Sequence, residues 1–407
     1  MPASAVEARA GFRVLTRAPG YLRLWGVGGL SNGMRQFEIL AAGLFTFQVT
    51  HSALAVAVVS ACRNLPMLLL GAFAGVVSES RDRRAILIAA QAVSAGASLT
   101  VAGLAAAGLA RPWVLALAAL ASGVMWSTEG ATRRRMLGEA VAPGLVARAY
   151  AFDSLTNSLV RMAGPVGAGV AFATLGLGGA FAVSGACYLV ALVLALGVPA
   201  GAPPVARPSA VATELAEGFR YARGHAAVAG SLAIIFVTNM FAFSYIALVA
   251  PVAERSFGVA PALVGVLAAG EPVGALLAGT YLARFGPPLR ERTVMVGGAA
   301  LFLAAVAVMP RMPSFALACL VMVPGGFGSA GFSAMQTTLI AGHTPPAVRS
   351  RVLGLLTVCI GAGPVGFLLL GGLGQAFGDR TALQLVAWVG LALVGAIGWW
   401  WRRREGG

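Results

Sequence analysis

Four ionisable residues stand inside long apolar runs of this sequence, where charge is unusual. They are Arg35 and Glu38 in the first run, Arg161 in the fifth and Glu271 in the eighth. An ionisable side chain in an apolar setting is costly unless it has a partner or faces a water-filled cavity. A carboxyl group removed from water can also bind and release a proton near neutral pH. We therefore predict that Glu38 and Glu271 are proton-binding residues.

Each of these charges also has a purely structural interpretation, which is an ion pair that stabilises the fold. Arg35 lies three residues before Glu38 and thus on the same helical face, so the two can pair. Glu271 has no arginine near it on its own segment, which favours a proton-binding role. Arg161 can pair with either acid or bind an anionic substrate, and these alternatives stay open. Arg63 is a further candidate for a cavity charge, unless it lies at the outer end of its helix near the lipid headgroups.

The composition indicates that lipid, not water, surrounds most of the chain. Of 407 residues, 58% are hydrophobic and 11% are charged, whereas soluble domains carry roughly 25% charged residues. A membrane-spanning helix needs about 20 apolar residues. We therefore expect an all-α integral membrane protein with twelve transmembrane helices. Their expected positions are near residues 22–49, 53–78, 85–109, 112–131, 149–175, 178–199, 226–252, 260–284, 293–310, 313–340, 352–377 and 380–401.

The distribution of arginine predicts the orientation of these helices. The net charge is +15, and every one of the 29 basic residues is Arg. With the amino terminus inside, 22 of them fall in cytosolic segments and four in outer loops. Cytosolic loops of membrane proteins carry this excess of positive charge, so the basic balance does not indicate a nucleic-acid partner. We expect a multi-pass protein of the bacterial cytoplasmic (inner) membrane with both termini in the cytosol.

A polar, proline-containing stretch at 200–225 divides the chain into two halves. We predict an N-terminal six-helix bundle at 1–199, a central cytosolic linker at 200–225 and a C-terminal six-helix bundle at 226–407. The Gly164-Pro165 pair in helix 5 returns as Gly363-Pro364 in helix 11. Such repetition is typical of transporters built from tandem repeats around a central cavity, so we expect two pseudo-symmetric bundles.

Two motifs resemble those of the major facilitator superfamily. The segment after helix 2 runs from Gly75 through Glu79 to Arg83 and Arg84, which resembles the superfamily's loop between helices 2 and 3, although Glu79 replaces an aspartate. The Gly164-Pro165 motif is similar to that of the drug:proton antiporter branch. The stretches that begin at Arg148 and Arg349 are similar to the subgroup that contains enterobactin and macrolide exporters.

The resemblance implies roles for these residues. Glu79 would close the cytosolic side by pairing with loop arginines or with a helix N-terminus of the other half; the alternative is that the arginines only set topology. Glu129 would join a charge relay with Arg83, unless it forms a simple pair with Arg133 four residues on. The Gly-Pro motif in helix 5 would take part in conformational change, unless it only allows close helix packing.

These features predict a secondary active transporter and argue against an enzyme. We expect proton-coupled efflux of a small organic or amphiphilic molecule (drug, macrolide or siderophore-like) by alternating access of a monomer. The alternatives are an importer or facilitator on the same fold, and a membrane sensor or scaffold that transports nothing. The sequence has no catalytic constellation, no phosphate-binding loop with Gly-Lys-Ser/Thr and no metal-ligand spacing among its four cysteines, so we expect no cofactor or metal.

Overall fold

The computed structural model describes residues 15, 18, 20–80, 82–199, 211–286 and 289–405, without the side chains of 72–80, 211, 212, 283, 347 and 405. Every regular element in this part of the chain is helical. The main helices are α2 (Tyr21–Thr50), α3 (Ala53–Ser80), α4 (Arg83–Ala106), α5 (Pro112–Glu139), α6 (Val146–Leu196), α7 (Val211–Gly224), α8 (Ala226–Val237), α9 (Val249–Phe257), α10 (Pro261–Phe285), α11 (Glu291–Val308), α12 (Phe315–Gly342), α13 (Pro346–Ile360), α14 (Gly363–Phe377) and α15 (Asp379–Glu405).

The expected all-helical membrane architecture is confirmed. Within the described ranges, 10 segments are long and apolar enough to cross a membrane. One of them contains α6, which makes two crossings because it turns back at Gly176, where φ is 66°. Ala149 and Ala195, near its two ends, pack in one hydrophobic cluster. Adding α2, which has 30 residues but also carries Arg35 and Glu38, is consistent with twelve crossings.

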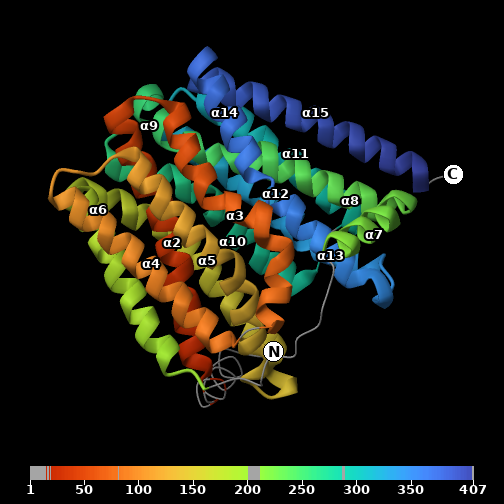
Figure 1. Ribbon diagram of the computed structural model, residues 1–407. Coiled ribbons are helices and arrows are strands. Elements are labelled where there is room, and N and C mark those ends of the chain that lie inside the picture. Colours follow the sequence, from red (N-terminus) through yellow and green to blue (C-terminus); the bar gives the residue numbers. More distant parts are fainter. Residues whose placement is uncertain are drawn as a thin grey trace, which may run out of the picture.

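The helices gather into two groups that meet along two seams (Figure 1). Helices α2 to α6 lie together, and α7 to α15 form the second group. The seams are the contacts of α6 with α10 and of α3 with α14. Glycines allow this proximity, because a Cβ at Gly265 would overlap the carbonyl of Pro165, and one at Gly371 would overlap Ala57. The division into two bundles at 200–225 stays a prediction, with 200–210 outside the described residues.

Two of the expected helices are interrupted. The segment expected at 226–252 is helical in α8, passes through a π-helical turn at Thr238–Ala242 and a 3-10 stretch at Phe243–Leu248, and continues as α9. The segment expected at 352–377 is divided into α13 and α14. A π-helical turn misaligns the regular hydrogen-bond pattern of an α-helix, and such turns are frequent at functional sites.

Helix ends define two faces of the molecule. The Arg-rich face holds the end of α5 and the starts of α4, α6, α11 and α13, and its described arginines include Arg83, Arg84, Arg134, Arg148, Arg290, Arg349, Arg351 and Arg402. The opposite face holds the turns after α2, α4, α9 and α14, with Arg111, Arg255, Arg311 and Arg380. By the positive-inside rule, we expect the Arg-rich face to be cytosolic.

Candidate substrate cavity and its charge pairs

A cavity of about 1200 Å³ lies between the two groups of helices. That volume suffices for a drug-sized organic molecule. The first group contributes polar side chains such as Asn32 and Asn64, and the second contributes Asn239 and Gln336. The aromatic residues in the lining are Trp126, Phe243, Tyr245 and Phe367. The surface is therefore mixed, with amide groups for hydrogen bonds and aromatic rings for apolar contact.

The cavity extends to the Arg-rich face and is closed toward the opposite face. Its lining includes Arg134 and Arg351, both at the Arg-rich ends of their helices. On the other side, Ser52 donates a hydrogen bond of 3.0 Å to Gln375 across the α3–α14 seam. Arg255 of α9 also donates to the backbone carbonyl of His51. The structure thus has an open Arg-rich mouth and a sealed opposite end.

Arg161 and Glu271 form an ion pair between the two groups of helices, with 2.8 Å between Nη2 of Arg161 and Oε2 of Glu271. Glu271 is almost fully buried on α10, and Ser329 of α12 donates a hydrogen bond to its other oxygen. The Arg161 side chain, on α6, is 32% exposed, and both residues line the cavity. Of the partners left open for Arg161 by the sequence, the structure selects Glu271. The sequence could not choose between Glu38 and Glu271, because Arg161 and Glu271 lie 110 positions apart.

Glu38 lies behind the cavity wall and not in it. Its carboxylate accepts a hydrogen bond of 2.7 Å from Arg63, another of 2.7 Å from Ser184 and a third from Ser98. All four side chains are buried in the first group of helices. The suggested pair of Glu38 with Arg35 is therefore wrong, and Arg63 is not among the residues that line the cavity.

Arg35 does line the cavity, but its contacts are uncharged. Its Nη2 donates a hydrogen bond of 3.1 Å to Oδ1 of Asn64. Its guanidinium carbon lies 3.7 Å from the ring centre of Trp126, which is cation–π geometry. The Nε atom is buried without a hydrogen-bond partner. Arg35 therefore brings a positive charge to the cavity that no carboxylate within ion-pair distance balances among the described residues.

The suggested ion pair of Glu129 with Arg133 is also wrong, because Arg133 pairs with Asp153 instead. Arg133 forms a two-pronged ion pair with Asp153, at 2.6 and 3.1 Å, and both side chains are buried. Glu129 is buried in a small pocket that it shares with Ser31 and Arg35. Asp153 lies in the second turn of α6, and both of its carboxylate oxygens accept hydrogen bonds from Arg133 of α5.

The gating motif is only partly described. Gly75 and Glu79 fall within α3, but their side chains lie outside the described part, so the closing contact expected for Glu79 stays a prediction. Arg83 pairs with Glu139 at 2.6 Å, and not with Glu129, so the relay implied by the resemblance is absent here. Arg84 donates a hydrogen bond of 2.5 Å to the carbonyl of Leu196.

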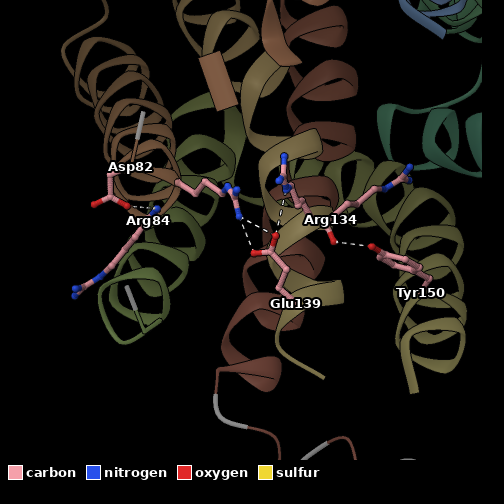
Figure 2. Close-up of polar contacts among 7 residues, drawn as sticks. Asp82, Arg84, Arg134, Glu139 and Tyr150 are labelled. Atoms are coloured by element: carbon pink, nitrogen blue, oxygen red, sulfur yellow. Dashed lines mark hydrogen bonds and ion pairs between the residues drawn. The ribbon is translucent and has the colours of Figure 1, made fainter. Parts of the chain in front are cut away.

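Local hydrogen bonds fix the Arg-rich face of the first group (Figure 2). Asp82 caps α4 by accepting a hydrogen bond of 2.9 Å from the backbone amide of Arg84. Tyr150 of α6 donates to the carbonyl of Arg134 near the end of α5, at 3.1 Å. The Tyr150 contact joins α6 to α5, and the ion pair of Arg83 with Glu139 joins α4 to α5.

The two Gly-Pro motifs lie in different local structures. Pro165 is inside α6, which stays helical there, and Gly164 packs against α2. Gly363 and Pro364 instead begin α14, after the helix has been interrupted. The sequence repeat therefore does not produce the same backbone in both halves, and a conformational role for either motif stays a prediction.

Two groups of functional candidates were missed by sequence reasoning. The first is Asn239, which the π-helical turn before α9 brings to the cavity. The second is Arg255, which pairs with Asp379 at 3.1 Å and reaches His51. The sequence signal for this second group is an acidic residue, Asp379, that directly follows Gly378 at the start of a helix.

Two bundles of membrane helices around a central cavity define a transporter of the major facilitator superfamily. The family described as transmembrane secretion effector matches residues 17–406, and the chain belongs to this family. The resemblance stated from the sequence is therefore confirmed, and the chain is a multi-pass membrane transporter and not an enzyme. Transporters of this superfamily bind small-molecule substrates.

Curated relatives include enterobactin exporters. The chain is 28% identical over 264 residues to the enterobactin exporter EntS of Citrobacter koseri, which covers 63% of each chain. It is 26% identical, with the same coverage, to EntS of Escherichia coli O1:K1 / APEC. The match thus spans 63% of the length of these relatives. Over this part of its length, the chain is similar to these enterobactin exporters.

Solved structures with the same fold show low sequence identity. A bacterial homologue of the human lysosomal transporter Spinster, in an inward-facing and unoccupied conformation, matches with a TM-score of 0.75 and 15% identity, covering 94% of this chain and 96% of that chain. A POT family transporter in complex with a thioalcohol-conjugated peptide matches with a TM-score of 0.73 and 10% identity, covering 93% and 95%. At these identities the likeness establishes the fold alone.

Proposed function

We propose that this protein is a proton-coupled exporter of a small organic or amphiphilic molecule, of drug, macrolide or siderophore type, which works by alternating access as a monomer. The substrate enters the central cavity from the Arg-rich face or the adjoining leaflet. The cavity then closes on that side and opens on the opposite face. The exporter names of the curated relatives support the direction of transport.

The observation that carries this proposal is the pair of Arg161 with Glu271. It joins the two groups of helices, lines the cavity and is reached by water from the Arg161 side. Protonation of Glu271 would remove the negative charge that holds Arg161. If the pair breaks when the cavity opens to the opposite face, a proton at Glu271 changes the relative free energy of the two states.

Glu38 is the weaker candidate for the proton. Its carboxylate accepts hydrogen bonds from Arg63, Ser98 and Ser184. All of these partners belong to the same group of helices, so protonation there would not loosen the contact between the halves. We therefore assign proton coupling to Glu271 and a structural role to Glu38.

The test is transport by purified protein in proteoliposomes with an imposed proton gradient. Naphthalene-2-carboxylate and naphthalene-2-carboxamide serve as labelled probes. We expect Glu271→Gln to abolish gradient-driven efflux while substrate exchange at equal pH on both sides persists. Glu291→Gln, at the start of α11 and away from the cavity, is the matched control and should transport as wild type. Unchanged gradient-driven efflux in Glu271→Gln would remove this residue from the mechanism.

Two rival functions are separated by the same preparation. An importer or facilitator on this fold would equilibrate the probes without a proton gradient, or accumulate them in the other direction. A sensor or scaffold would neither exchange nor accumulate them. The large cavity with both polar and aromatic walls favours transport over the second rival.

We also propose that the protein resides in the bacterial inner membrane with both termini in the cytosol. The support is the concentration of arginine on one face. Reporter fusions at the two ends should give the same cytosolic signal. Signals from opposite sides of the membrane would refute this orientation, and with it the even number of crossings.

A further inference from the structure

Arg35 differs from the other arginines buried in or beside the cavity. Arg63, Arg133 and Arg161 each form an ion pair with a carboxylate. Arg351, at the mouth, pairs with Glu217. Arg35 has a single amide oxygen and an aromatic ring as its partners.

The charge of Arg35 is held in place and incompletely satisfied. Stacking on Trp126 fixes the plane of the guanidinium group, and the bond to Asn64 fixes its rotation in that plane. Its buried Nε has no hydrogen-bond partner. The nearest opposing carboxylate, Glu129, lies in the adjoining small pocket and forms no ion pair with it among the described residues. Glu129 attracts Arg35 from there without contact, and an arginine in the membrane interior with no carboxylate at ion-pair distance is stabilised when an anion reaches it.

We propose that Arg35 is the anchor for an anionic group of the substrate, so that the transported molecules are organic carboxylates with an aromatic or other apolar body. A planar guanidinium binds a carboxylate through two parallel hydrogen bonds. Rings on the opposite wall, Phe243 and Tyr245, accept the apolar body. This inference rests on the proposed function only in treating the cavity as the substrate site.

Preorganisation strengthens this assignment. Arg161 and Arg63 also lie near Arg35, but each already has its own carboxylate, so neither is available to an incoming anion. Their positive charges discourage a cation from entering this part of the cavity. The structure thus presents an available guanidinium group deep in the cavity, at mid-height of α2 and next to the ring of Trp126.

The experiment compares two isosteric probes that differ in charge, naphthalene-2-carboxylate and naphthalene-2-carboxamide. Binding of each to purified protein in lipid nanodiscs is measured by calorimetry, at a pH where the acid is ionised. We expect wild type to bind the carboxylate at least about tenfold more tightly, which corresponds to about 1.4 kcal/mol. Arg35→Gln should reduce this preference to about onefold while it still binds the carboxamide, which also shows that the variant is folded.

Two further variants refine the comparison. Arg35→Lys keeps the charge but not the two-pronged geometry, so an intermediate preference is expected. Arg148→Gln removes one exposed arginine from the Arg-rich face and should keep the full preference, which separates a specific contact from the general positive field. Persistence of the preference in Arg35→Gln, or its absence in wild type, would overturn the assignment.

The outcome is independent of the proposed direction and energetics of transport. Charge-dependent binding at Arg35 without any flux in proteoliposomes would support the anchor and refute the exporter. Gradient-driven efflux of the carboxamide, combined with no preference for the carboxylate, would refute the anchor and support the exporter.

Discussion

Arg255 of α9 and Asp379 at the start of α15 form an ion pair, with 3.1 Å between Nη1 and Oδ2, at the closed end of the cavity. Both residues belong to the second group of helices, but their ion pair positions Arg255 for contact with the first group. Asp379 orients Arg255 toward the carbonyl of His51, and the guanidinium lies 4.7 Å from the ring centre of Phe47 on α2. The pair therefore supports a contact that must break when the opposite face opens.

Arg255→Gln should shift the protein toward a state open at the opposite face. The Arg255 side chain is 45% exposed, so solvent weakens its contact with His51. We therefore expect the loss of this contact to change the equilibrium between the two conformations by about two- to fivefold. Spin labels at Val49 and Phe377, in a background without native cysteines, report the distance between the two groups of helices by double electron–electron resonance. Arg111→Gln, on the same face but outside the seam, is the control. An unchanged distance distribution in Arg255→Gln would contradict this role.

Asp153→Asn should destabilise the first group of helices. The substitution leaves Arg133 charged and buried, and breaking a buried pair in this way costs about 3–5 kcal/mol. The expected result is a Tm lower by several degrees in a thermal melt in detergent. Glu217→Gln breaks an exposed pair with Arg351 and should cost at most about 1 kcal/mol. Equal effects of the two substitutions would be inconsistent with a dry Arg133–Asp153 pair.

Glu38→Gln should reduce stability without changing the proton dependence of transport. Arg63 would lose its only ion-pair partner seen in the described residues, while Ser98 and Ser184 keep an oxygen to bind. The double substitution Glu38→Gln with Arg63→Gln removes both charges and should recover part of the lost Tm. Loss of proton-driven efflux in a variant that melts like wild type would instead make Glu38 a coupling residue.

Gly326→Ala should disturb Glu271 through the backbone. A Cβ at Gly326 would overlap the carbonyl oxygen of Glu271, because α12 and α10 cross there in direct contact. We expect lower transport and a lower Tm, since α10 must move away and carry Glu271 from Arg161. Gly279→Ala on α10 is the matched control, as its Cβ meets nothing within 4 Å. Wild-type transport in Gly326→Ala would show that the position of Glu271 tolerates this shift.

Local patterns in the sequence were sufficient for the architecture. Apolar runs of sufficient length can satisfy their backbone only as helices in lipid, and this physical constraint places most helix ends within a few residues. It did not reveal the interruption before α9 or the break between α13 and α14, because both depend on packing against the neighbouring bundle. Arg35 and Glu271 were identified as exceptional from the sequence, since charge in an apolar run is visible without coordinates.

The partners of these charges were decided only by the tertiary structure. Spacing along one helix suggested Arg35 with Glu38 and Glu129 with Arg133, but the structure pairs Glu38 with Arg63 and Arg133 with Asp153. A buried charge takes the partner that completes its hydrogen bonds with the least strain, and that partner can lie on any neighbouring helix. The sequence by itself determined which side chains need a partner in the membrane, whereas the crossing of the helices determined which of them, Arg35, is left available at the cavity.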